Sequence, residues 1–261
     1  MYTKSDLIKH IKEMGIKPSD TLMIHSSMKS IGEVEGGADT VLDAFIEYME
    51  PGLLIFPTHT WAQMSEEHCI FDPLTEPSCV GILTNLFMKR PGVIRSWHPT
   101  HSVAALGKDA AEYVAGEERW DTPCPREGCW GRLYDRKAKI LFIGCGLIRN
   151  TYIHSVEEWN NVENRFTEKR VNLKIKTPDG SLIERPVYRH YTPIGSIALN
   201  YDKLETPFIE TGIATRGKLG DASCILGDAV GMGDLTTEFL QRNKDLFMDR
   251  EPIPREWYIK E

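Results

Sequence analysis

Apolar residues repeat along the chain in two patterns, one typical of amphipathic helices and one typical of buried strands. Helical spacing occurs in residues 3–14, 38–49, 80–90, 108–116 and 234–247. Short apolar runs that are typical of strands occupy residues 21–27, 52–61, 101–107 and 139–146. Because strands and helices alternate, we predict an α/β fold whose central sheet is mixed but largely parallel and is flanked by helices.

The pattern changes after Trp159. Residues 171–191 alternate apolar and polar positions around a P-D-G turn, which predicts an antiparallel hairpin that extends the core in the C-terminal half. From Thr206 the chain contains a segment interrupted by glycine and threonine, followed by the last predicted helix. The chain has no internal repeat and no linker-like segment, so we predict a single domain over residues 1–261.

Composition narrows the class of protein. The chain has 261 residues, of which 41% are hydrophobic and 26% charged, so it is long enough to bury a large core. Its formal net charge of −7 argues against nucleic acid as a partner and fits a cationic substrate. The N-terminal residues lack the apolar core of a signal peptide and no stretch reaches membrane-spanning length, so we expect a cytoplasmic protein without membrane contact. The six cysteines are scattered and predict neither a disulfide framework nor a zinc ribbon.

The first stretch with candidate chemistry is HSSMKSIGEVEGGADTV, residues 25–41, in which a strand ends in serines and a glycine loop precedes a helix. A helix start behind glycines presents free backbone N–H groups and the positive end of the helix dipole, which suits a phosphate or pyrophosphate. The spacing matches neither a P-loop nor a G-x-G-x-x-G fingerprint. The residues alone are therefore also compatible with an ordinary glycine turn.

The second stretch is RSWHPTHSVAALG, residues 95–107, which places one arginine, two histidines and two serines directly before or at the start of a strand. The separation of His98 and His101 suits zinc only if another segment supplies a third ligand. Pro99 disfavours a helical H-x-x-H pair, since the residue before proline avoids the helical region. We therefore expect His101 to be structural and the other polar side chains to face a ligand. These side chains are Arg95, Ser96, His98 and Ser102.

The third stretch is TYIHSVEEW, residues 151–159, which follows the most apolar strand and places His154 in the first turn of a predicted helix. Glu157 and Glu158 follow one turn later, where either carboxylate can reach the imidazole. The helix dipole disfavours the imidazolium and a carboxylate favours it, so a histidine balanced in this way can act as a general base. A structural cap and a metal site are the alternative interpretations.

The three stretches, in this order, resemble the aminoglycoside 3-N-acetyltransferase family, whose members transfer acetyl from acetyl-CoA to an amine of an antibiotic sugar. The similarity rests on H-S-S followed by G-G, on F-P-T-H-T-W, on PSCVGILTNLFMKRPGVIRSWHPTHSVAALG, and on G-C-G followed by T-x-x-H-x-x-E. Its most specific motif spans residues 77–107. The family implies an α/β fold distinct from the GNAT acetyltransferases, no metal, and direct attack of the amine on the thioester.

The resemblance also implies roles for particular residues. His154 resembles the family's general base, Glu157 the carboxylate that orients it, and Thr151 a group that holds the thioester carbonyl. Acetyl-CoA is the implied co-substrate. One side of its site would consist of Ser26, Ser27, Gly36, Gly37 and Thr40, and a second wall of Arg95, Ser96, His98, Ser102 and Val103.

The implied acceptor is a cationic small-molecule amine. A protonated amine fits an acidic pocket, and the loop after the second strand offers Glu66, Glu67 and Asp72 as candidate contacts. The sequence departs from the family's pattern in EGCWGRLYD, where the bulky Trp130 stands in place of small residues, and the C-terminal part offers few matches. Another amino sugar or a natural-product amine is therefore an alternative acceptor.

Two other classes of protein fit parts of the pattern. A relative that only binds the coenzyme would keep the pocket without turnover, but it would not need a base paired with a carboxylate. A metal-dependent hydrolase could use His59, His98, His101 or His154 as ligands, and metal analysis of the purified protein would test this alternative.

Overall fold

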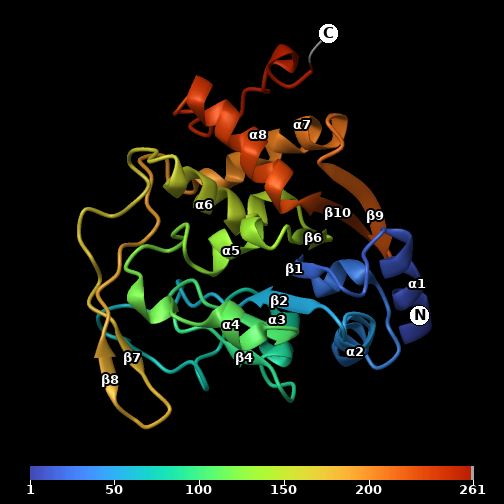
Figure 1. Cartoon of the computed structure of the whole chain (residues 1–261), viewed down its shortest axis with the longest axis horizontal. Helices are drawn as coiled ribbons and strands as arrows, with labels where there is room; N and C mark the ends of the chain where they lie inside the picture. The colour runs from blue at the N-terminus through green and yellow to red at the C-terminus, as the bar shows by residue number, and fades with distance from the viewer. Residues whose placement is uncertain (260–261) are drawn as a thin grey trace.

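The computed structural model describes residues 1–259, and its centre is a seven-stranded sheet with helices on both faces (Figure 1). The strand order is β4-β5-β2-β1-β6-β10-β9. The strands are β1 (Thr21–Ser26), β2 (Leu53–Pro57), β4 (Ile94–Arg95), β5 (Val103–Gly107), β6 (Lys139–Ile143), β9 (Ala214–Leu219) and β10 (Ala222–Asp228). The predicted α/β fold with a mixed, helix-flanked sheet is confirmed.

The parallel part of the sheet is smaller than predicted. Strand β1 pairs in parallel with β2 on one side and with β6 on the other, whereas the outer pairings are all antiparallel. The prediction of a largely parallel sheet is therefore wrong outside these three central strands. For the pairings β4–β5 and β9–β10 the physical reason is the short connection between the two strands, which reverses the direction of the chain.

Strands β9 and β10 form a hairpin that the sequence pattern did not indicate. Gly220 and Asp221 join them, and Gly220 has a φ of 59°, in the left-handed region that glycine adopts without strain. Strand β9 lies at the edge of the sheet, where Arg216 and Lys218 are exposed. It therefore lacks the apolar run by which a buried strand is recognised.

Helices cover both faces of the sheet, because alternate residues of each strand point to opposite layers. Leu22 and Ile24 of β1 pack with α1, α2 and α3, whereas Met23 belongs to the core that includes α4 to α8. The helices are α1 (Lys4–Glu13), α2 (Ala38–Tyr48), α3 (Ile82–Phe87), α4 (Ala110–Val114), α5 (Cys129–Asp135), α6 (Thr151–Trp159), α7 (Glu205–Glu210) and α8 (Ala229–Arg242). Within residues 1–259, no helix has the length and apolar character needed to cross a membrane.

Helix α8 differs from its predicted range, 234–247, at both ends. It begins at Ala229, where the Asp228 side chain accepts a hydrogen bond from the backbone N–H of Gly231 at 2.8 Å. Gly231 and Gly233 in its first turns weaken the helical pattern of the sequence, since glycine is a poor helix former. The cap and the packing of the helix against β10 and α6 decide its start instead.

The predicted hairpin extension is confirmed. Strands β7 (Lys174–Lys176) and β8 (Leu182–Glu184) pair antiparallel, and β7 also pairs with β3 (Ile70–Phe71). The hairpin lies apart from the central sheet, at the lower left of Figure 1. The small sheet has its own apolar cluster, formed by Met64, Phe71, Leu173, Ile175 and Val187. The chain returns from it through residues 189–198, which border the main cavity of the molecule.

Candidate active site

A cavity of about 950 Å³ opens at the carboxyl ends of the parallel strands, the edge where ligands bind in α/β sheets. The ends of β1 and β6 supply Ser26 and Gly144 to its wall, and the start of α6 supplies Thr151 and His154. The segment 189–198 forms a further part of the wall. The volume lies near the upper end of the range for small-molecule sites.

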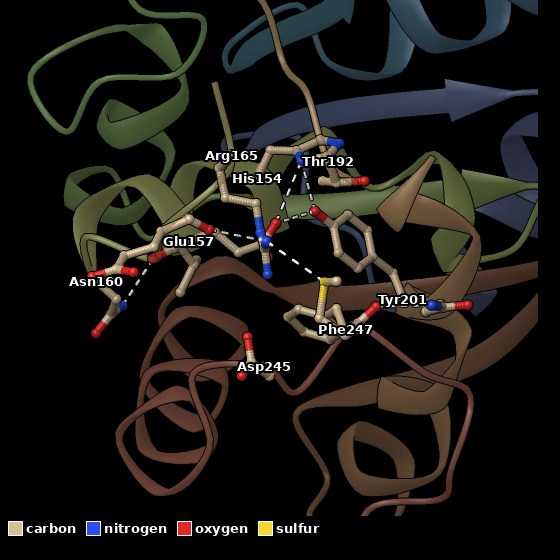
Figure 2. A network of polar contacts seen from close by, with 12 residues as sticks. His154, Glu157, Asn160, Arg165, Thr192, Tyr201, Asp245 and Phe247 are labelled. Atoms are coloured by element: carbon tan, nitrogen blue, oxygen red, sulfur yellow. Dashed lines mark hydrogen bonds and ion pairs between the residues drawn. The ribbon is translucent and has the colours of Figure 1, made fainter. Parts of the chain in front are cut away.

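His154 is oriented by a tyrosine and a glutamate (Figure 2). Its Nδ1 lies 2.6 Å from the hydroxyl oxygen of Tyr201 and 3.5 Å from Oε2 of Glu157. The Tyr201 hydroxyl also donates a short hydrogen bond to Glu157. Since that hydroxyl has only one proton, it must accept from Nδ1–H of His154, which leaves Nε2 of His154 free to accept a proton.

Glu157 is almost fully buried and is held as a carboxylate by Arg165. The Nε of Arg165 donates to Oε1 of Glu157 at 2.6 Å, and the two side chains are 4% and 1% exposed. Burial raises the pKa of Glu157, but the hydrogen bonds and charges of His154, Arg165 and Tyr201 outweigh it and leave the pKa below its usual range. Such a pair is sensitive to loss of either partner, because the remaining charge would be buried without compensation.

The neighbouring Glu158 turns away from His154. It accepts hydrogen bonds from the Thr122 hydroxyl and, at 3.1 Å, from the backbone N–H of Cys124. Burial raises the pKa of Glu158 to about 7, because no cation pairs with it among the described residues. Of the two carboxylates one turn after His154, Glu157 is the one that contacts the histidine.

Thr151 contacts a histidine from the loop after β2. The Nε2 of His59 lies 3.1 Å from the Thr151 hydroxyl, while Nδ1 of His59 has no hydrogen-bond partner among residues 1–259. Burial lowers the pKa of His59 well below its usual value, so the ring is neutral. A proton on Nδ1 would be buried without an acceptor, so we assign the proton to Nε2. The Thr151 oxygen then accepts from His59, and its own proton is free to point into the cavity.

Three further histidines line the cavity, namely His25, His101 and His190. His190 stacks on His154 with ring centroids 4.1 Å apart, and His101 lies 4.7 Å from His190. Burial lowers the pKa of all three, that of His25 to about 3, so they are neutral at pH 7. No group of three or more His, Cys, Asp or Glu side chains within residues 1–259 is arranged to hold a metal ion.

Trp130, which departs from the family's pattern, is fully buried in α5 behind these rings. Its ring stacks on His59 with centroids 5.4 Å apart, and its Nε1 donates to the backbone carbonyl of His101 at 3.2 Å. It does not itself line the cavity. The bulky side chain therefore supports the wall of histidines from behind instead of filling the space in front of them.

The residues predicted for one side of the coenzyme site fall into two groups. Ser26 and Ser27 line the cavity at the end of β1. Gly36, Gly37 and Thr40 lie at the start of α2 and outside the cavity wall. The two glycines have φ values of 72° and 64°. Helix α2 begins at the sheet edge at which β1 ends, because it connects β1 to the parallel strand β2.

The residues predicted for the second wall do not face the cavity. Arg95 donates to the backbone carbonyls of Glu76 and Thr58 at 2.5 and 2.7 Å, and it is tied into the loops behind the wall. Thr100 and His101 line the cavity in that region instead. All five residues are buried and none lines the cavity, so their contact with the coenzyme stays a prediction: Arg95, Ser96, His98, Ser102 and Val103.

The three acidic residues predicted to contact a cationic acceptor also point elsewhere. Asp72 pairs with Lys176 at 3.0 Å, and Glu66 accepts from the side chain of Asn172 at 3.2 Å, so both tie their loop to the hairpin segment. Glu67 is exposed and bonded within its own loop. None of these three candidates lines the cavity.

Three residues around His154 were not identified from the sequence: Arg165, His190 and Tyr201. Arg165 offers one weak signal, since it follows Glu157 by eight residues in the polar segment after α6. No spacing rule connects His190 or Tyr201 to His154, because both reach it through the fold of the C-terminal half.

The fold and the paired histidine and carboxylate define an α/β enzyme with a group that can move protons on a bound substrate. More narrowly, the chain belongs to the aminoglycoside 3-N-acetyltransferase family, whose model matches residues 23–241. It is an acetyltransferase that uses acetyl-CoA as its donor. Aminoglycoside N(3)-acetyltransferase VII of Streptomyces paromomycinus is 30% identical over 271 residues, which cover 92% of this chain and 91% of the relative.

Solved structures of this family share the fold. AAC-IIIb in binary complex with CoASH aligns with a TM-score of 0.82 at 21% identity, over 97% of this chain and 99% of the other. A mutant of AAC(3)-IVa in complex with a gentamicin aligns with a TM-score of 0.81 at 23% identity, over 94% and 91% of the two chains. The family resemblance inferred from the motifs is therefore confirmed, and so is the fold that it implied.

Proposed function

We propose that the protein transfers acetyl from acetyl-CoA to an amine of a small molecule, with His154 as the general base. The observation that supports this role is the hydrogen-bond chain from Glu157 through Tyr201 to Nδ1 of His154, because in the neutral ring it places the proton on Nδ1 and leaves Nε2 of this cavity-lining histidine as the acceptor. A protein that only bound the coenzyme would have no use for this arrangement.

In the proposed reaction, the acceptor nitrogen attacks the carbonyl carbon of the thioester while Nε2 of His154 takes a proton from it. The new C–N bond forms first, and the C–S bond then breaks. The imidazolium returns the proton to the departing CoA sulfur, so the products are the amide and free CoA. The carboxylate of Glu157 stabilises the transient imidazolium through the Tyr201 hydroxyl.

Thr151 is proposed to stabilise the negative charge that develops on the thioester oxygen. His59 donates to the Thr151 oxygen, so the threonine proton can point into the cavity toward that charge. The hydroxyl is thereby pre-oriented before the substrate binds. His59 acts as a positioning residue in this scheme.

For acetyl-CoA, we propose that Ser26 and Ser27 contact the arm that carries the thioester, since both line the cavity. Gly36, Gly37 and Thr40 at the start of α2 are proposed to hold the phosphate end outside it. Free N–H groups and the positive end of the dipole at a helix start favour phosphate.

The proposed acceptor class is an amino sugar. The relatives are named as acetyltransferases of aminoglycosides, and one solved neighbour is a complex with a gentamicin. The 3-N amine of an aminoglycoside is therefore the first acceptor to be tried. Other amino sugars and natural-product amines are the second candidate, supported by the absence of the predicted acidic contacts from the cavity wall within residues 1–259.

A panel of amines incubated with acetyl-CoA, with free thiol monitored, tests the proposal. His154→Ala should lower kcat by roughly two to four orders of magnitude, the usual range for loss of a general base. Calorimetry should show CoA binding nearly unchanged. His68→Ala is the matched control, because His68 is half exposed and lies outside the cavity. Full activity of His154→Ala in a folded protein would contradict the proposed role.

A further inference from the structure

The charge of the cavity wall is opposite to that of the whole protein. The chain has a formal net charge of −7, yet the wall described within residues 1–259 contains three arginines and neither aspartate nor glutamate. The arginines are Arg149, Arg165 and Arg189. Carboxylates favour the binding of a sugar that carries several ammonium groups, and this wall contributes none within residues 1–259.

Two of these arginines are not neutralised by a carboxylate. Arg165 is paired with Glu157, but neither Arg149 nor Arg189 forms an ion pair within residues 1–259. Arg189 donates to the backbone carbonyls of Trp61 and, at 3.4 Å, Met64, which orient its guanidinium without cancelling its charge. His59, His101 and His190, which also line the cavity, are neutral because burial lowers their pKa values. They therefore add no charge that could compensate the two arginines.

Arg189 belongs to the part of the wall that surrounds the base. The next residue, His190, stacks on His154 at 4.1 Å, and Figure 2 shows Arg165 and Thr192 beside His154. Arg189 and His154 thus line the same cavity, and the residue next to Arg189 contacts the ring of the base. Arg149 lies instead in the turn after β6, the strand that pairs with β1, on the side proposed for the coenzyme.

We propose that the acceptor is a small amine that also carries an oxyanion, a carboxylate or a phosphate, and that Arg189 binds this group. The inference rests on the proposed acetyl transfer and names its substrate class. A guanidinium matches the geometry of both oxyanions and holds its charge at any pH at which the enzyme works. A polycationic sugar would place its ammonium groups against uncompensated positive charge.

The same charge assists the chemistry. Only an unprotonated amine can attack the thioester, and nearby positive charge lowers the pKa of an ammonium group. The wall therefore favours the reactive form of the acceptor nitrogen while the oxyanion anchors the molecule. A wall of carboxylates would bind a cationic sugar more firmly but would stabilise the ammonium form, which His154 would then have to deprotonate.

Kinetics with matched amino sugars test the inference. Glucosamine 6-phosphate and muramic acid carry a phosphate and a carboxylate, glucosamine carries neither, and gentamicin is the polycation. At least one of the two anionic sugars should exceed glucosamine in kcat/KM by about tenfold or more, and gentamicin should be the poorest. The KM of the anionic sugar should rise with salt, while that of glucosamine should not.

Variants of Arg189 separate recognition from folding. Arg189→Gln should remove most of the roughly tenfold preference for the anionic sugar, while the KM for acetyl-CoA stays within about twofold. Arg189→Lys should keep much of the preference, because it keeps the charge. Arg216→Gln, which removes an exposed arginine of β9, is the matched control and should change none of these values.

Three results would overturn the inference. If gentamicin had the highest kcat/KM and lost it in His154→Ala, the acceptor class would be wrong while the proposed acetyl transfer stood. If Arg189→Gln and Arg189→Lys slowed all acceptors equally, Arg189 would have only a structural role. If no amine were acetylated, the proposed function would fail. The inference about the acceptor would then be tested by calorimetry of the CoA complex. Tighter binding of gentamicin than of both anionic sugars would overturn it.

Discussion

Helix α6 carries two adjacent glutamates that lie in opposite environments. Glu157 faces Arg165, Tyr201 and His154, and these partners hold its pKa below the usual range in spite of burial. Glu158 faces the loop at Thr122 and receives only neutral donors, so burial raises its pKa to about 7. Consecutive residues of a helix point in directions about 100° apart, which is enough to place identical side chains in different surroundings.

The difference shows that burial alone does not decide whether a carboxyl group is charged. Both glutamates are largely removed from water, yet a buried arginine compensates one and not the other. The compensated carboxylate can stabilise an imidazolium, whereas the other can exist as a neutral acid near pH 7. The first is suited to a role beside a base, and the second to holding a loop.

Among variants that change the surroundings of the two glutamates, Arg165→Met should have the largest effect, because it leaves Glu157 as an uncompensated buried charge. We expect the free energy of unfolding to fall by about 3–5 kcal/mol, the usual effect of breaking a buried pair from one side. The acid limb of the pH–rate profile should move to higher pH, because unopposed Glu157 favours protonated His154. Chemical denaturation and kinetics measure the two effects.

The exposed Arg170, which pairs with Asp121, provides the matched control for this variant, and Arg170→Met should cost less than about 1 kcal/mol. The double variant Glu157→Gln with Arg165→Met should recover part of the lost stability, because it removes both charges. Additive losses in the double variant would show that the two residues are not coupled.

Glu157→Gln is the next strongest test. The amide cannot stabilise an imidazolium, and it leaves the charge of Arg165 close to His154 without compensation. We expect kcat to fall by about 10- to 100-fold, within the range for a group that assists a general base. The acid limb of the pH–rate profile should move to lower pH, opposite to its shift in Arg165→Met. Shifts in the same direction for both variants would contradict this account of the network.

Tyr201→Phe should have a smaller effect. It removes the hydroxyl that joins His154 to Glu157, but the direct distance of 3.5 Å between Nδ1 and Oε2 allows the two to move into contact. We expect kcat to fall by about three- to tenfold, since one buried hydrogen bond is lost and partly replaced. A loss in kcat as large as that of His154→Ala would indicate that Tyr201 itself takes part in proton transfer.

Glu158→Gln should leave kcat within about twofold, because Glu158 does not contact His154. Its effect appears in stability. The folded pKa of about 7 lies above the value of 4.5 for a free glutamate, so the wild-type protein loses stability as pH rises between these values. Glutamine resembles the protonated acid, so the variant should avoid this loss, which is on the order of 3 kcal/mol.

Denaturation of the wild-type protein and Glu158→Gln at pH 5 and pH 8 measures this difference. Glu117, whose pKa burial also raises to about 7, is present in both proteins and cancels in the comparison. The stability of Glu158→Gln relative to wild type should increase from pH 5 to pH 8. The same relative stability at both values would show that Glu158 is charged throughout.

The sequence by itself determined the local elements and the spacing within them. The helices over 3–14, 38–49, 80–90 and 108–116 contain the observed α1 to α4, because apolar periodicity reflects short-range backbone geometry. The contact between His154 and Glu157 likewise follows from their three-residue interval, because side chains at this spacing are neighbours on a helix. The family motifs added the donor, acetyl-CoA, which no periodicity could have supplied.

Only the tertiary structure decided which groups surround those residues and what charge they carry. Arg165, Tyr201 and His190 reach His154 from separate segments, and Arg95 is turned into the protein although its motif predicted a ligand contact. Burial, protonation and the charge of a cavity depend on neighbours that are distant in the chain. A pattern of residue types along one segment cannot contain that information, because the fold brings the neighbours together.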